Sequence, residues 1–150
     1  MTSPAKSMVY FYYETPVNIR NRAVLKKFIE GLFKKEGYKL KNLNYIFCTD
    51  KRLLDINKQF LSHNYYTDII TFPLSEAPNP IEGEIYISID RVKENAMTEK
   101  EPLNRELLRV IFHGALHLCG YTDKTKREKE KIREREDFYI NKYMRLSSSV

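Results

Sequence analysis

The chain alternates short runs of aromatic and β-branched residues with longer segments that carry a helical pattern of apolar residues. Runs of the first kind favour β-strands, and segments of the second kind favour helices. Strands are expected at residues 8–13, 43–49, 67–73 and 83–89. Helices are expected over residues 19–36, 51–60, a short stretch after Asp90, a segment that starts near Pro102, and 124–145. This order predicts a fold of the α/β class (α+β type), with one small mixed four-stranded sheet packed by about five or six helices.

Polar and glycine residues mark where the expected helices begin or end. Asn18 is of a type that caps helix N-termini, so the first helix is expected to start at Ile19. Gly37 follows that helix and is expected to end it. Asp50 is the expected cap of the second helix. With 150 residues, the chain is long enough to bury a sizeable core in a single domain, residues 1–150.

The composition narrows the class of protein. The formal net charge is +6, which favours a polyanionic partner, although a lysine-rich solvated surface would give the same charge. Cys48 and Cys119 are too few for a disulfide framework and are expected to be buried thiols. The N-terminus lacks the pattern of a signal peptide, and no apolar run approaches membrane-spanning length. A cytoplasmic protein with no membrane partner is therefore expected.

The segment His113-Gly-Ala-Leu-His117-Leu-Cys-Gly120-Tyr-Thr-Asp123 predicts a metal site at the end of a helix. It holds two of the three histidines in the chain. On a helix, residues four apart lie on one face with Cβ atoms roughly 5–6 Å apart, so both imidazoles can reach one ion. Gly120 can end the helix and let the chain turn, which would bring Asp123 back as a third ligand. Three protein ligands leave one position open for water or substrate, as in catalytic sites.

The alternative for this segment is a pair of hydrogen-bonded core histidines. At about 100° per residue, the apolar stripe of the helix consists of Leu107, Leu108, Ile111, Ala115 and Leu118. His113 and His117 share a different face, which favours the metal site. Gly114 costs roughly 1 kcal/mol relative to alanine inside a helix, and close approach of a strand or of substrate would explain it. Zinc proteases place a glutamate at this position as general base, so peptide hydrolysis is disfavoured.

The same string, HGALHLCGYTD, closely resembles the signature H-G-x-L-H-L-x-G-Y-D-H of the YbeY family, which are metal-dependent endoribonucleases that act in ribosomal RNA maturation. Residues 56–57 with 67–73 resemble the family's L-N…T-D-V-L-S-F-P block, and residues 83–88 resemble its G-D-I-x-I-S strand. The resemblance covers most of the chain from about residue 43 onward.

This resemblance implies a function, a cofactor and partners. The function is hydrolysis of phosphodiesters in single-stranded RNA, in 16S rRNA 3′-end maturation and ribosome biogenesis. The cofactor is one Zn²⁺ per chain, or nickel or another divalent ion, held by His113, His117 and Asp123. The partners are ribosomal RNA and the small ribosomal subunit or its assembly proteins. The alternative function is a ribosome-assembly binding factor with a largely structural metal and little nuclease activity.

Two positions depart from the family pattern. Asp123 stands where the third ligand is usually histidine, and a carboxylate oxygen is an acceptable zinc ligand. Its negative charge should make a bound water less acidic. Leu61 stands where the family commonly has an arginine that is proposed to contact RNA phosphate. The nearby candidates for that contact are Arg52, Lys58 and His63.

Further candidates come from the two strand blocks and from the last helix. Asp68 and Glu84 stand in the matching strand blocks and are candidates for the general base. Basic residues that follow the metal segment are candidates for RNA binding, namely Lys124, Lys126 and Arg127. Glutamates in the same helix can pair with them at i,i+4 spacing, so a solvated surface helix remains an alternative; these are Glu128, Glu130, Glu134 and Glu136.

Overall fold

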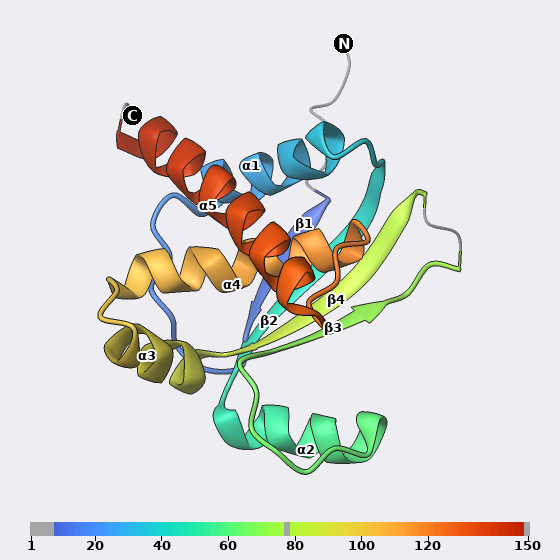
Figure 1. Cartoon of the computed structure of the whole chain (residues 1–150), viewed down its shortest axis with the longest axis vertical. Helices are drawn as coiled ribbons and strands as arrows, with labels where there is room; N and C mark the ends of the chain where they lie inside the picture. Colours follow the sequence, from blue (N-terminus) through green and yellow to red (C-terminus); the bar gives the residue numbers. More distant parts are fainter. Residues whose placement is uncertain (1–7, 77–78, 149–150) are drawn as a thin grey trace.

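The structure is a computed structural model that describes residues 8–76 and 79–148. In chain order its elements are β1 (Val9–Tyr13), α1 (Arg22–Lys35), β2 (Leu40–Cys48), α2 (Asp50–Leu61), β3 (Ile69–Pro73), β4 (Ile81–Ser88), α3 (Ile89–Thr98), α4 (Leu103–Leu118) and α5 (Lys126–Ser148). The predicted α+β class is confirmed, with five helices in the described residues (Figure 1). None of the described helices is long and apolar enough to cross a membrane.

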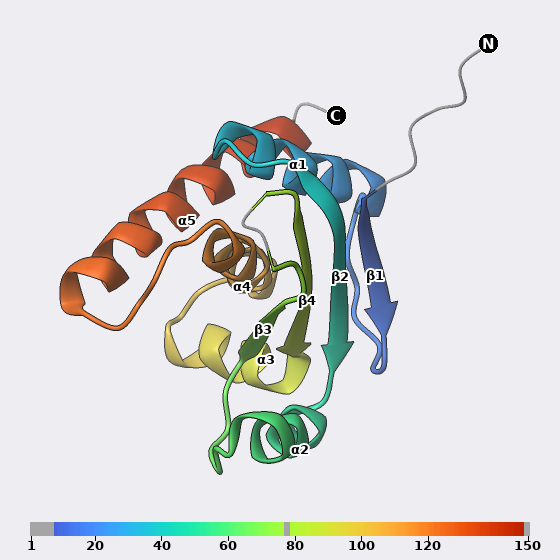
Figure 2. The same cartoon turned by 90° about the vertical axis from the view of Figure 1, so that its right-hand side faces the viewer.

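The four strands form one mixed sheet in the order β1-β2-β4-β3. β1 and β4 both pair parallel with β2, whereas β3 pairs antiparallel with β4. Figure 2 shows α1, α4 and α5 stacked over one face of this sheet, with α2 beyond the carboxyl ends of β2 and β4. The helix that carries the histidine pair is therefore enclosed between the sheet and α5.

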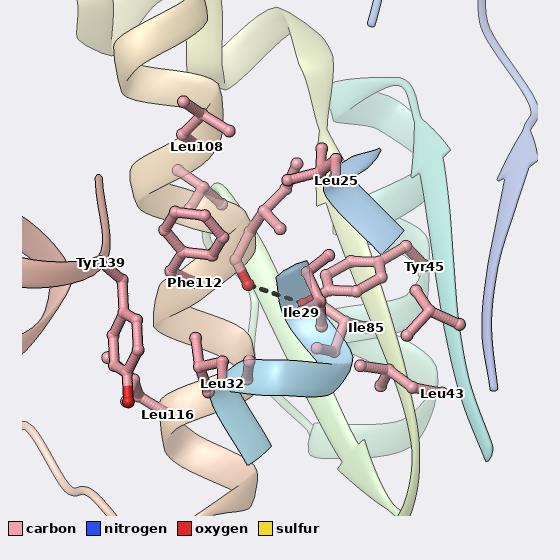
Figure 3. Close-up of a cluster of buried hydrophobic side chains, with 14 of the residues drawn as sticks. Leu25, Ile29, Leu32, Leu43, Tyr45, Ile85, Leu108, Phe112, Leu116 and Tyr139 are labelled. Carbon is pink, nitrogen blue, oxygen red and sulfur yellow. Dashed lines mark hydrogen bonds between the residues drawn. The ribbon is translucent and has the colours of Figure 1, made fainter. Parts of the chain in front are cut away.

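The core fills the space between the sheet and the helices that cover it (Figure 3). α1 contributes one row of apolar side chains and α4 another, and both meet Tyr45 and Ile85 of the sheet. Tyr45 is fully buried, and its hydroxyl donates a hydrogen bond of 2.8 Å to the carbonyl of Ile111. This bond satisfies the buried phenol and ties β2 to α4, so α4 has a fixed position over the sheet.

Two sequence-based helix boundaries need correction. α1 begins at Arg22 and not at Ile19, because Asn21 adopts the left-handed conformation (φ 51°, ψ 52°) immediately before the helix. Ile19 is buried in the segment ahead of it. The N-cap of α2 is Thr49 and not Asp50, since the Thr49 hydroxyl accepts the backbone N–H of Arg52 at 3.2 Å.

Two other expectations from the sequence are confirmed. Gly37 follows α1 with φ +91°, a conformation that glycine adopts without strain. Cys48 and Cys119 are both buried free thiols. Burial raises the pKa of each thiol to about 12. Because the thiolate is the nucleophilic form of cysteine, these pKa values argue against a nucleophilic role for either residue.

Gly114 is where α4 approaches the sheet most closely. A Cβ at this position would lie 2.8 Å from Ile85 Cδ1 and 3.0 Å from both Ile69 Cδ1 and Ile85 Cγ2. The predicted approach of a strand therefore explains the glycine. Rotating Cδ1 of Ile85 about χ2 would not relieve the contact with Cγ2, because the position of Cγ2 depends on χ1, which is restricted in β-branched residues.

We expect Gly114→Ala to lower the free energy of unfolding by about 1 kcal/mol, since overpacking costs more than alanine's helix propensity returns. The matched control is Gly31→Ala on α1, where no described atom beyond the adjoining helix backbone and chain neighbours lies within 4 Å of the Cβ position. That variant should raise the free energy of unfolding by about 1 kcal/mol. Urea denaturation of the three proteins measures both changes. An increase in the free energy of unfolding of Gly114→Ala would contradict this prediction and would mean that β4 shifts to accommodate the Cβ.

Candidate metal site

His113, His117 and Asp123 converge on one point at the carboxyl end of α4. The two histidine Nε2 atoms are 2.9 Å apart, and Asp123 Oδ2 lies 3.4 Å from each. A tetrahedral zinc ion with bonds of about 2.0–2.1 Å would separate its ligand atoms by about 3.3 Å. The two distances to Asp123 fit this value, and the separation of the two imidazoles is somewhat shorter. The donor set fits a divalent ion, with two nitrogen ligands and one oxygen ligand.

The turn that carries Asp123 is anchored from two helices. Gly120 has φ +98° and ends α4, and the backbone N–H of Tyr121 returns to the Leu116 carbonyl at 3.1 Å. The Tyr121 hydroxyl then donates to Glu36 Oε1 at 2.8 Å. Glu36 lies at the end of α1 and also accepts bonds from Arg135 and Tyr139 of α5, and this network holds the turn against α1 and α5.

Glu136 of α5 holds His113 from behind. Its Oε2 lies 2.5 Å from His113 Nδ1, and its Oε1 accepts from Arg109 Nη1 at 3.1 Å. Glu136 is only 3% exposed, so this carboxylate is not part of a solvated helix face. By accepting the Nδ1 proton, it fixes the tautomer in which His113 Nε2 is free to bind an ion. Burial lowers the pKa of His113, but the hydrogen bond and charge of Glu136 outweigh it and leave the pKa raised.

We expect Glu136→Gln to weaken metal binding by about 10- to 100-fold, because partners behind a ligand orient it and raise its basicity. The matched control is Asp137→Asn. Asp137 also binds Arg109, at 2.7 Å, but its half-exposed side chain makes no hydrogen bond or ion pair with His113 or His117. Competition with a chromogenic chelator measures the zinc affinity of each protein. Equal zinc affinities for wild type and Glu136→Gln would show that Glu136 does not contribute to metal binding.

A polar cavity of about 430 Å³ opens beside the three ligands and is lined by both His113 and Asp123. Asp68, at the start of β3, lines the same cavity and accepts a hydrogen bond of 3.2 Å from Asn95 of α3. Burial raises the pKa of Asp68, although the nearby charge of His113 opposes the shift. The structure therefore brings one of the two predicted general-base candidates to the site.

Glu84 lies on the opposite face of the sheet. Successive side chains of a strand point to opposite faces. A Cβ at the preceding residue, Gly83, would touch Leu118 of α4, so that face of β4 looks toward the metal site. Glu84 looks away from it, and the structure does not bring this carboxylate to His113.

The candidates for RNA binding fall into two groups. Lys124 directly follows Asp123, and Lys126 and Arg127 open α5, so this exposed group borders the metal site. The second group lies on α2 and the loop after it, and consists of Arg52, Lys58 and His63. Arg52 is occupied by Glu14, with Nε and Oε1 3.3 Å apart.

Sequence patterns did not indicate Glu136 or Arg109, and Glu136 was expected among the glutamates of a solvated surface helix. One signal for Glu136 exists in the sequence. It falls on the apolar stripe of α5 that consists of Ile132, Tyr139, Ile140 and Tyr143, all of them buried. A carboxylate on such a stripe predicts a buried partner.

Comparisons with known proteins agree with this fold. The family model described as Endoribonuclease YbeY matches residues 13–144. An Endoribonuclease YbeY of Cytophaga hutchinsonii is 49% identical over 132 residues, which is 88% of this chain and 92% of the relative. One of Karelsulcia muelleri is 44% identical over 133 residues, 89% of this chain and 94% of the relative. The solution structure of a Thermotoga maritima protein matches 93% of both chains, with a TM-score of 0.65 and 29% identity.

Proposed function

The chain belongs to the YbeY family of endoribonucleases, and we propose that it hydrolyses phosphodiester bonds of single-stranded RNA at the site formed by His113, His117 and Asp123. The observation that carries this proposal is the convergence of three ligand atoms beside a polar cavity. The whole chain, residues 1–150, would act as one endoribonuclease domain.

We propose one Zn²⁺ per chain as the cofactor. When bound, the ion would polarise a phosphoryl oxygen or lower the pKa of a water molecule. Two imidazoles and one carboxylate suit zinc, and nickel or another divalent ion would fit the same donors. Cys119 is not proposed as a ligand, because it is buried and is not among the residues whose ligand atoms converge.

The side chains around the ligands would position the RNA and move the proton. Asp68 would accept the proton of the water that attacks phosphorus, while the bond from phosphorus to the leaving oxygen breaks and that oxygen takes a proton from solvent. Lys124, Lys126 and Arg127 would hold the RNA backbone beside this cavity. Cleavage should therefore weaken steeply as salt rises, because each neutralised phosphate releases counterions.

Ribosomal RNA is the proposed substrate, with maturation of the 16S rRNA 3′ end as the reaction and the small ribosomal subunit or its assembly proteins as partners. The alternative, a binding factor with a largely structural metal, is not favoured, because the relatives are named endoribonucleases.

The test is incubation of zinc-loaded protein with a single-stranded fragment that spans the 16S rRNA 3′ end. Internal cleavage that a chelator abolishes would support the proposal, and binding without cleavage would favour the alternative.

A further inference from the structure

The loop between α2 and β3, residues 62–68, exposes two adjacent aromatic rings. Tyr65 and Tyr66 are each 55% exposed. Single exposed aromatic residues are common on protein surfaces, whereas a pair on a short loop beside the proposed catalytic cavity is typical of a binding surface. Polar residues surround the pair in sequence, namely Ser62, His63, Asn64 and Thr67.

The rings are held in place by the buried residue Asn57. Asn57 is 1% exposed, its Nδ2 donates to the Tyr65 carbonyl at 2.9 Å, and its own carbonyl accepts the His63 N–H at 3.1 Å. The His63 ring stacks on the Tyr65 ring, with centroids 5.1 Å apart and an interplanar angle of 24°. The Tyr65 hydroxyl lies 2.8 Å from His63 Nδ1. The loop therefore presents preorganised rings to solvent.

The loop is continuous with the proposed catalytic cavity. Tyr66 precedes Asp68 by two residues, so their Cα atoms are within about 7 Å. The guanidinium of Arg91 lies 5.1 Å from the centre of the Tyr66 ring. Asp50 fixes that guanidinium with a bond of 2.7 Å. Asp68 lines the cavity, so the aromatic pair and the Arg91 plane lie at the end of the loop segment that leads into it.

We propose that Tyr65 and Tyr66 form a stacking platform for the bases of single-stranded RNA next to the scissile phosphate. This proposal rests on the proposed function. Unpaired bases stack on aromatic rings and on arginine planes, and Tyr66 with Arg91 offers both. Such a platform would bind RNA through its bases, although Leu61 stands where the family commonly has an arginine.

The experiment uses zinc-loaded protein and a short single-stranded RNA that contains 2-aminopurine beside the cleavage position. In Tyr65→Leu/Tyr66→Leu, we expect the quenching of 2-aminopurine to be lost and KM to rise about tenfold or more, with kcat unchanged. The variant Tyr65→Phe/Tyr66→Phe keeps the rings and should restore both. The matched control is Tyr10→Leu/Tyr12→Leu on β1, where the side chains are 38% and 50% exposed.

The outcomes separate this proposal from the proposed function. If wild type cleaves the RNA and the loop leucine variant has the same KM and the same quenching, the platform is wrong and the nuclease stands. The platform is also wrong if the control variant loses as much affinity as the loop variant. If wild type neither binds nor cleaves RNA, both proposals fail. A melting temperature equal to that of wild type shows that the loop variant is folded.

Discussion

Replacing His113 and His117 together with alanine is expected to reduce RNA cleavage by on the order of 10³-fold or more, because the ion supplies several kcal/mol of transition-state stabilisation. The double variant keeps only Asp123 of the three ligands that converge in the structure. A single carboxylate beside solvent should not hold an ion at micromolar concentration. The measurement is the cleavage rate together with the zinc content of each purified protein.

The control for this experiment is wild-type protein stripped with a chelator and reloaded with zinc. The reloaded protein should regain the full rate, whereas the double variant should not respond to added zinc. Equal cleavage by wild type and the double variant, purified side by side, would mean that the activity belongs to a contaminant. If zinc-bearing wild-type protein does not cleave RNA, the result would favour the alternative function, a ribosome-assembly binding factor.

The metal cluster could be predicted from the sequence because its geometry is local. His113 and His117 lie one helical turn apart, and a glycine-ended helix followed by a short turn leaves few places for Asp123. The residues behind the cluster could not be predicted in the same way. His113 and Glu136 are 23 residues apart, and Arg109 and Glu136 are 27 apart, so only the packing of α5 on α4 brings them together.

The fold shows the same division between local and long-range information. Strand-like and helix-like runs predicted the α+β class and a small mixed sheet, because the formation of each strand and helix depends on short-range sequence patterns. The order β1-β2-β4-β3 depends on which strands pair, and no pattern along the chain encodes that pairing. β2 and β4 also begin earlier than expected, at Leu40 and Ile81, because these two residues pair with each other at the start of the parallel ladder.

Asp68 and Glu84 illustrate how strand geometry decides which carboxylate can act as the general base. Both were equal candidates from the sequence. β3 begins just after Asp68, at the edge of the cavity, whereas the period-two alternation of β4 sends Glu84 to the other face. The face of the sheet on which a side chain lies therefore separates the candidate base, Asp68, from Glu84, which faces away from the site.

Asp68→Asn is expected to lower kcat by about 10²–10⁴-fold, the usual contribution of a general base. The amide keeps the size of the side chain and an oxygen that can accept the Asn95 bond. It cannot accept a proton at neutral pH, so the loss should appear in kcat with zinc content unchanged. The matched control is Glu99→Gln, which removes another carboxylate that lines the same cavity and should leave kcat near the wild-type value.

The pH profile provides the second readout for Asp68. A general base works only when deprotonated, so the wild-type rate should fall as pH falls through the pKa of Asp68. Burial raises that pKa above the ordinary aspartate value of 3.8, so the fall should begin at a higher pH than for an exposed aspartate. In Asp68→Asn this limb should disappear from the residual rate. Because metal binding itself depends on pH, zinc content is measured at each pH. A wild-type profile retained by Asp68→Asn would assign the proton transfer to another group.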